Sequence, residues 1–557
     1  MKSWLHFLIV SSLATLLLVW PLLVPLQSQE LLPGSRVWGN FQLDAQYYQE
    51  DSLIGAPDVR EKILMNSFAN LNFSYKGVTL GMRYESYQNP LLGFDSRYQG
   101  SGIPYRFASY TRDGLEVTLG NFYEQYGNGL IMRSYVEPNL GIDNALDGVR
   151  LLYRPVDGIT LRTMVGKQRL YWDKGPGIVR GADAEFHLNS IMGTLEESPN
   201  QWTIGLSGVS KFQEDQNPLY NLPENVAAFA GRLNYTRGAF HLNAEYAYKA
   251  NDPSADNNFI YRHGEALTLS GSYSFSGFGL LLSAKRIDNM GFRSNRASLD
   301  NDLHINYLPA MTRQHVYSLT GMYPYATQPT GELGALAELT FRLPRQTWWG
   351  GPFGTTVTAN FSLANAIDKQ PINDTISVGQ TGTEGYTSGF FTPGDEKFFQ
   401  DFNLEVSRRF STTLRGTFTY MNLFYNQNRI EGYQDKEDVK AHIFVADMNH
   451  RLPQRRSLRW EVQHLSTAQD NGNWIMALVE VNLSTRWFIS VADQYNYGND
   501  DKDMRQHYYT VNAGYTQNAN RFTLGWGRQR EGIICVGGVC RVLPASSGLT
   551  LSITSSF

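Results

Sequence analysis

Apolar and polar residues alternate with a period of two in one segment after another of this chain. In residues 37–48, Val, Gly, Phe, Leu, Ala and Tyr alternate with Trp, Asn, Gln, Asp, Gln and Tyr. Residues 78–85, 240–249 and 267–275 repeat the pattern. Successive side chains of a strand point to opposite faces, so each segment has one apolar and one polar face. Such segments have the length of strands that cross a bilayer at a tilt, about 9–11 residues.

The composition agrees with membrane strands and excludes several other classes. Charged residues make up 18% of the 557 residues and aromatic residues 13%. The mean hydropathy of −0.35 is too polar for a bundle of membrane helices. A net charge of −4 gives no general attraction to nucleic acid, so no nucleic-acid partner is expected. These facts together predict an all-β protein, a single large transmembrane antiparallel up-and-down β-barrel, apolar outside and polar inside.

The N-terminal segment has the pattern of an export signal. Lys2 precedes an almost continuous apolar run over residues 4–26, which ends before a polar stretch. We interpret residues 1–28 as a secretory signal peptide and residues 29–557 as the barrel. The alternative is a retained anchor helix, which the two prolines inside the run disfavour.

Short and long connections follow one another between the predicted strands. The short turns carry glycine, as at Gly77, Gly114 and Gly238, and glycine supplies the backbone conformation that tight hairpins need. In outer-membrane barrels the short turns are periplasmic and the long loops extracellular. We therefore expect an integral protein of the Gram-negative outer membrane with periplasmic N- and C-termini. The expected long loops are 49–62, 88–103, 123–147, 170–182, 213–225, 250–261, 365–397 and 427–437.

Two termini on the same side require an even number of strands. A direct count gives about 25 candidates. The alternation of short and long connections fails between residues 288 and 332, and a short extra strand near residues 304–308 restores it. We therefore predict about 26 strands, within a range of 22–26.

The C-terminal segment is amphipathic and ends on an aromatic residue. Apolar residues alternate with Ser and Thr over residues 549–557, and the chain ends at Phe557. This pattern predicts the insertion signal that the barrel-assembly machinery of Gram-negative bacteria recognises. The alternative is a soluble edge strand, but an open edge with this apolar face would aggregate.

Three stretches resemble a known family. They are GNFYEQYGNGL at 120–130 with GIDNALDGVR at 141–150, WEVQHL at 460–465, and CVGGVCR at 535–541, followed by the Ser-Ser-Phe end. They are similar to an uncharacterised family of Bacteroidota outer-membrane β-barrels. The resemblance implies the barrel and its location, and it implies no activity.

Residues 120–150 combine repeated glycine with charges of both signs. Glycines let a backbone turn tightly, so we predict that this segment folds into the barrel as a constriction or plug. Arg133 is expected to brace against one of the acids, and two arginines on the inward phase of nearby strands offer further partners. A purely structural brace is preferred over a binding site. The predicted residues of this constriction are Glu124, Arg133, Asp143, Asp147, Arg150 and Arg162.

Cys535 and Cys540 are the only cysteines, and in an exported protein such a pair is expected to form a disulfide. Their ring would stiffen a surface tip; protection from proteolysis and a redox switch are the alternatives. Two cysteines cannot complete a tetrahedral zinc site. The acids of loop 365–397 have no calcium-loop spacing. We expect neither a metal nor a cofactor.

No sequence feature points to catalysis. Residues 120–150 contain no histidine that could act as a base, and the chain has no nucleophile elbow. We expect a non-enzymatic accessory or scaffold protein of a surface-export or barrel-assembly complex. The alternative is a porin-like pore or ligand-specific channel. The expected partners are outer-membrane lipid, the assembly machinery during insertion and other envelope proteins.

Overall fold

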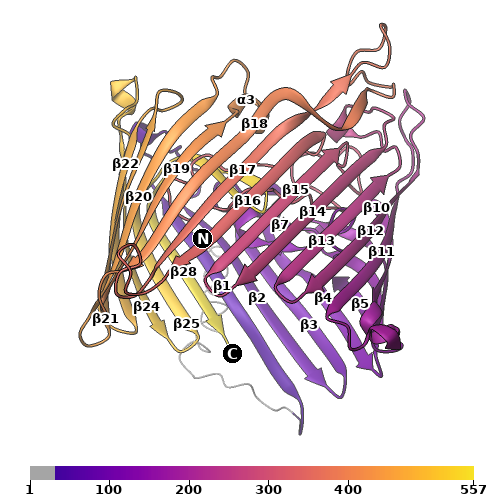
Figure 1. Cartoon of the computed structure of the whole chain (residues 1–557), viewed down its shortest axis with the longest axis horizontal. Helices are drawn as coiled ribbons and strands as arrows, with labels where there is room; N and C mark the ends of the chain where they lie inside the picture. The colour runs from indigo at the N-terminus through magenta and orange to yellow at the C-terminus, as the bar shows by residue number, and fades with distance from the viewer. Residues whose placement is uncertain (1–31) are drawn as a thin grey trace, which may run out of the picture.

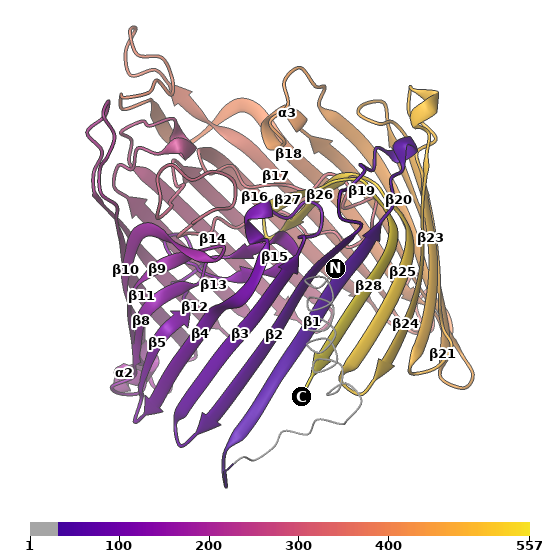
Figure 2. The same cartoon turned by 180° about the vertical axis from the view of Figure 1, so that it is seen from behind.

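The computed structural model describes residues 32–557, so the predicted signal peptide at 1–28 lies outside the described residues. Twenty-four antiparallel strands form one sheet. Its first strand, β1, pairs with β2 on one edge and with the last strand, β28, on the other, which closes the sheet into a barrel (Figures 1 and 2). The predicted all-β barrel is confirmed.

The wall strands, in chain order, are β1 (Arg36–Tyr48), β2 (Ile63–Tyr75), β3 (Val78–Gln88), β4 (Gly100–Arg112), β5 (Leu115–Phe122), β8 (Leu146–Tyr153), β9 (Ile159–Leu170), β10 (Asp173–His187), β11 (Asn200–Phe212), β12 (Asn225–Arg237), β13 (Phe240–Lys249), β14 (Gly264–Phe275), β15 (Phe278–Asp288), β16 (Gly331–Leu343), β17 (Thr355–Gln370), β18 (Thr387–Arg409), β19 (Leu414–Tyr425), β20 (Val439–Leu452), β21 (Arg456–Thr467), β22 (Trp474–Asn482), β23 (Trp487–Tyr495), β24 (His507–Gln517), β25 (Asn520–Gln529) and β28 (Ser546–Ser556).

Four short strands form two hairpins outside the wall: β6 (Val136–Glu137) with β7 (Ile142–Asp143), and β26 (Gly532–Val536) with β27 (Val539–Leu543). The helices of the described residues are short: η1 (Ser52–Ile54), η2 (Ser96–Tyr98), η3 (Pro138–Leu140), α2 (Leu188–Ile191), η4 (Gly193–Leu195), η5 (Ala255–Asn257), α3 (Gln427–Ile430) and η6 (Lys502–Met504). None of the helices in residues 32–557 is long and apolar enough to span a membrane.

The strand number is 24, which lies within the predicted range of 22–26 but differs from the preferred value of about 26. The extra strand expected near residues 304–308 does not form. Residues 289–330 contain one isolated bridge, between Arg293 and His304, and otherwise no strand. Many of their apolar side chains are buried inside the barrel, including Ile305 and Leu319. The break in the alternation of short and long connections therefore marks a long infolded segment and not an extra wall strand.

The short turns form where glycine predicted them, and two predicted loops differ from the structure. The predicted loop 365–397 is limited to residues 371–386, because β17 and β18 extend into it. Residues 170–182 are not a loop, because β9 and β10 join directly at Tyr171 and Trp172. The sequence Gly175-Pro-Gly177, inside this predicted loop, belongs to β10. A Cβ at Gly175 would lie 2.9 Å from the side chain of Leu303, and one at Gly177 would lie 2.0 Å from a backbone oxygen. The glycines therefore let residues 289–330 approach the wall.

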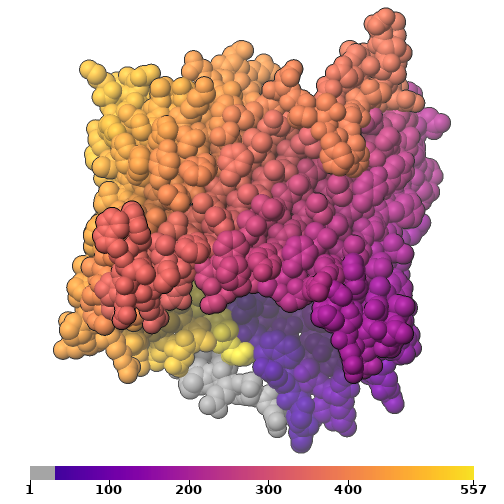
Figure 3. All heavy atoms as spheres, viewed as in Figure 1, coloured from indigo at the N-terminus to yellow at the C-terminus, as the bar shows by residue number. Residues whose placement is uncertain are grey.

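The outer face of the wall is apolar. Leu80, Leu206, Phe229 and Phe444 are all exposed there, between 45% and 60%. Figure 3 shows that face as a continuous surface of side chains. A soluble protein rarely leaves so large an apolar surface uncovered. The sequence periodicity thus assigned the outward and inward residues correctly.

The seam between the first and last wall strands includes the C-terminal residue. Backbone N–H groups of Gly39 and Phe557 each donate to the other residue's carbonyl, at 3.1 and 3.0 Å. Gly39 also leaves room for the Phe557 ring, since a Cβ there would lie 2.9 Å from it. Phe557 therefore completes the closure of the barrel. Whether it acts as an insertion signal stays a prediction.

Candidate functional site: the filled lumen

Three chain segments fold into the barrel and fill much of its interior. We name them the first loop (residues 123–145, between β5 and β8), the second loop (residues 289–330, between β15 and β16) and the disulfide hairpin (residues 532–543, β26 and β27). Figure 2 shows the hairpin running from the upper ends of β25 and β28 across the barrel. The site is built from their contacts with one another and with the wall.

The first loop reaches wall strands several positions away from its own. The N–H of Asn128 donates to Oε2 of Glu245 at 2.6 Å. The side-chain amide of Asn128 donates to Asn243 at 2.9 Å and to Thr268 at 3.1 Å. These acceptors lie on β13 and β14, whereas the loop leaves the wall at β5. The loop therefore extends into the lumen.

The first and second loops pair with each other through their backbones. The N–H of Arg133 donates to the carbonyl of Ile305 at 2.8 Å, and that of Tyr307 to the carbonyl of Gly129 at 2.9 Å. Gly129 has φ +92°, a conformation that favours glycine. Residues 130–132 of the first loop are completely buried in an apolar cluster that includes Ile305. The two loops thus form one packed unit.

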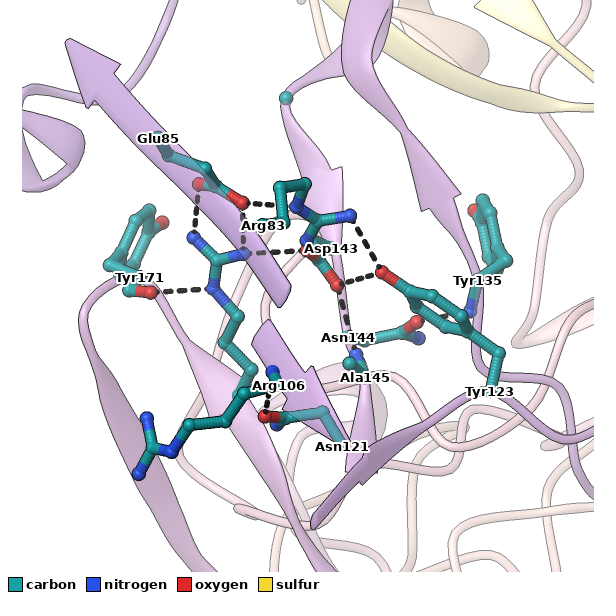
Figure 4. Close-up of polar contacts among 12 residues, drawn as sticks. Arg83, Glu85, Arg106, Asn121, Tyr123, Tyr135, Asp143, Asn144, Ala145 and Tyr171 are labelled. Atoms are coloured by element: carbon teal, nitrogen blue, oxygen red, sulfur yellow. Dashed lines mark hydrogen bonds and ion pairs between the residues drawn. The ribbon is translucent and has the colours of Figure 1, made fainter. Parts of the chain in front are cut away.

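A cluster of four charged side chains joins the first loop to the wall (Figure 4). Asp143 of the loop accepts hydrogen bonds from Arg83 on β3 and from Arg169 on β9, the latter at 2.6 Å. Glu85 on β3 pairs with both arginines, at 2.6 Å each. All four side chains are buried, and the two positive and two negative charges balance. Such balance is needed because an unpaired buried charge is costly.

Neutral groups complete the coordination of Asp143. The hydroxyl of Tyr123 donates to Oδ1 at 2.9 Å, and the N–H of Ala145 donates to the same oxygen at 3.1 Å. Burial and the Asp143 carboxylate raise the pKa of Tyr123, so its hydroxyl keeps its proton and remains a donor. Asp143 is therefore the main polar attachment of the first loop to β3 and β9.

The other predicted acids pair with wall cations. Glu124 lies 2.7 Å from Arg150 of β8, which also pairs with Glu116. Asp147 lies at the start of β8 and pairs with Lys174 at 2.5 Å, close to solvent. The structure thus brings Glu124 and Arg150 together, and it places Asp143 and Asp147 in separate contacts.

Arg162 and Arg133 behave differently from the prediction. Arg162 points inward but pairs with the wall residue Asp183 at 2.6 Å. The predicted ion pair of Arg133 with an acid of residues 120–150 is not formed. Its guanidinium lies over the rings of Tyr307 and Tyr135, at 3.9 and 4.8 Å from their centroids. The acids are already occupied by wall cations, so aromatic faces stabilise this charge instead.

The second loop is fixed to the wall in its C-terminal half. Near its C-terminal end, Tyr325 donates to Glu332 at 2.5 Å, and Glu332 pairs with Lys285 of β15 at 2.6 Å. Leu319 and Tyr323 pack against inward apolar residues of the wall strands β18–β22. The second loop thus packs against the first loop through one part and against these wall strands through another.

The predicted disulfide between Cys535 and Cys540 is present. The expectation that it stiffens a surface tip is wrong, because the hairpin folds inward onto the second loop. The N–H of Ala310 and the hydroxyl of Tyr307 both donate to the carbonyl of Gly537, at 3.3 and 2.6 Å. The hairpin tip is therefore held against the second loop.

Several residues of this site were not singled out in the sequence. Arg83 and Glu85 occupy inward positions of an alternating strand, and charge at such positions was the available signal. The failed alternation between residues 288 and 332 was the signal for the second loop. Among residues 32–557, no three His, Cys, Asp or Glu side chains are arranged to hold a metal ion.

The fold and site define a class: a large closed β-barrel whose lumen is partly filled by its own connecting segments. The family model "Family of unknown function (DUF6029)" matches residues 1–557, and the chain belongs to that family. No curated protein matches the chain.

Solved structures with a similar fold include the P pilus usher (PapC) translocation pore, at 10% identity and TM-score 0.45, over 93% of this chain and 99% of that one. Others are the siderophore receptor PirA from Pseudomonas aeruginosa (11%, TM-score 0.41, 94% and 80%) and the copper transporter OprC (9%, TM-score 0.39, 95% and 82%). Likeness at this level supports no functional argument.

Proposed function

We propose that the chain is an outer-membrane channel whose lumen is narrowed by its own infolded segments. The exposed apolar face of the wall supports membrane insertion, because lipid would cover it. A closed barrel satisfies all its backbone groups without an edge, as a bilayer requires.

One observation supports a channel in preference to the scaffold role that we expected from the sequence. The infolded segments do not fill the lumen beside β28, β1 and β2. They leave a cavity of about 520 Å³ between these strands and the disulfide hairpin. Its wall side is lined by polar residues such as Gln42, Gln46 and Ser552. Among residues 32–557, we find no comparable surface feature that favours a scaffold.

Planar-bilayer recording of the purified protein tests the proposal. Replacing residues 532–543 with two glycines removes the hairpin beside this cavity and should raise the single-channel conductance severalfold. A matched control deletes residues 371–380, an exposed stretch between β17 and β18. That control should leave the conductance unchanged.

If the barrel still conducts no current after the hairpin is removed, the channel proposal is overturned. If such a silent barrel also co-purified with other envelope proteins, the scaffold role would be supported instead. Folding of each variant is checked by heat-modifiable migration, so a misfolded protein is not mistaken for a closed one.

A further inference from the structure

The cavity beside β28, β1 and β2 contains one unpaired charge of each sign. Asp44 of β1 and Arg541 of the disulfide hairpin both line it. Their side chains form no ion pair with each other or with any other described residue. This separates them from the charged cluster of Arg83, Glu85, Asp143 and Arg169, where each charge is compensated.

Arg541 is a cation without an anionic partner. Its Nε and Nη1 atoms are buried and have no hydrogen-bond acceptor in the described structure. Its guanidinium lies 3.9 Å from the centroid of the Phe94 ring, which compensates only part of the lost hydration. Burial lowers the pKa of Arg541 to about 10, so the group is still charged at neutral pH. A carboxylate on a bound solute would supply the missing partner.

Asp44 is the matching anion on the wall. It is the one carboxylate among the inward-facing residues of the described strands β28, β1 and β2, where its register neighbours are Asn66 and Ser552. Gln42 donates to Oδ2 of Asp44 at 2.7 Å, and no described residue donates to Oδ1. An ammonium group on a solute would pair with it.

We infer that this cavity is a binding site for a short zwitterionic peptide. Arg541 binds the terminal carboxylate and Asp44 the terminal ammonium group. A solute with a single charge would meet one attractive and one repulsive group. Gln42, Gln46 and Asn66 supply amide donors and acceptors for a peptide bond. The volume of about 520 Å³ lies within the usual range of small-molecule sites.

This inference names the solute class of the proposed channel and thus rests on that function, but equilibrium binding tests it without any measurement of conductance. The full-length protein in detergent is titrated calorimetrically with alanyl-alanine, its N-acetyl form and its C-terminal amide. We expect alanyl-alanine to bind at least tenfold more tightly than either capped form. Because the change is made in the ligand, this comparison does not depend on a variant that folds.

Two variants assign each end of the ligand. In Asp44→Asn the penalty for N-acetylation should disappear, and in Arg541→Gln the penalty for the amide should disappear. Arg415→Gln is the control, since Arg415 lines a different cavity, and it should keep both penalties. Equal binding of the three ligands, or no binding at millimolar concentration, would overturn the inference. A conducting channel with that result would leave the proposed function intact.

Discussion

Asp143 Oδ2 lies 2.6 Å from Nη1 of Arg169, and this ion pair attaches the first loop to the barrel wall. The contact is buried together with Arg83 and Glu85, so four charges depend on one another. The contacts that attach the loop are therefore expected to be lost together.

Asp143→Asn should destabilise the protein strongly. It leaves two buried guanidinium groups to share the carboxylate of Glu85, and breaking a buried pair costs about 3–5 kcal/mol. Urea unfolding in detergent measures the loss of free energy. Asp147→Asn is the control: its partner Lys174 is half exposed, so the loss should stay below about 1 kcal/mol. Equal losses in the two variants would contradict the assigned role of the cluster.

The contribution of Arg133 to the free energy of unfolding should depend on an aromatic ring and not on an acid. In a double-mutant cycle, Arg133→Ala and Tyr307→Leu should show a coupling energy of about 1 kcal/mol, the usual strength of a partly buried cation–π contact. Arg133→Ala combined with Asp143→Asn should be additive within about 0.5 kcal/mol. A coupling energy with Asp143 and none with Tyr307 would contradict this contact and support the ion pair expected from the sequence.

The sequence predicted the wall much better than the lumen. Alternation fixes which side of a strand a residue faces, so Asp44, Arg83 and Arg150 were placed inward correctly. It does not say which inward charges meet, because partners such as Asp143 and Arg169 come from different segments of the chain. Ile305 and Leu319 are buried by the barrel interior, and the order of short and long connections does not distinguish such an infolded segment from an extra wall strand.

The disulfide should protect the hairpin from opening. Closing a ring of this size contributes about 2 kcal/mol, or about thirtyfold in the opening equilibrium. Reduction should therefore speed tryptic cleavage after Arg541 by about that factor, as followed by mass spectrometry. Cleavage after Lys502, in an exposed helix of another long connection, serves as the internal reference. If the reductant leaves the cleavage rate at Arg541 unchanged, the hairpin is held by its other contacts alone.

Deleting Phe557 should reduce assembly into the outer membrane. The deletion removes both backbone hydrogen bonds to Gly39 at the seam, along with the last outward-facing side chain. The amount of heat-modifiable protein in the membrane fraction measures the effect. Phe557→Tyr keeps the ring and the backbone bonds and should assemble normally. Normal assembly of the deletion variant would mean that Phe557 is dispensable for insertion.

The proposed channel requires a water-filled path through the cavity beside β1, and cysteine modification tests this requirement most directly. The hairpin-deleted protein lacks both native cysteines, so an introduced cysteine is its one thiol. Gln42 lines the cavity, whereas its neighbour Leu43 points to the opposite face of the same strand. A charged, water-soluble thiol reagent should reduce the current through Gln42→Cys and leave the current through Leu43→Cys unchanged. Equal effects on both variants, or no effect on Gln42→Cys, would contradict the path.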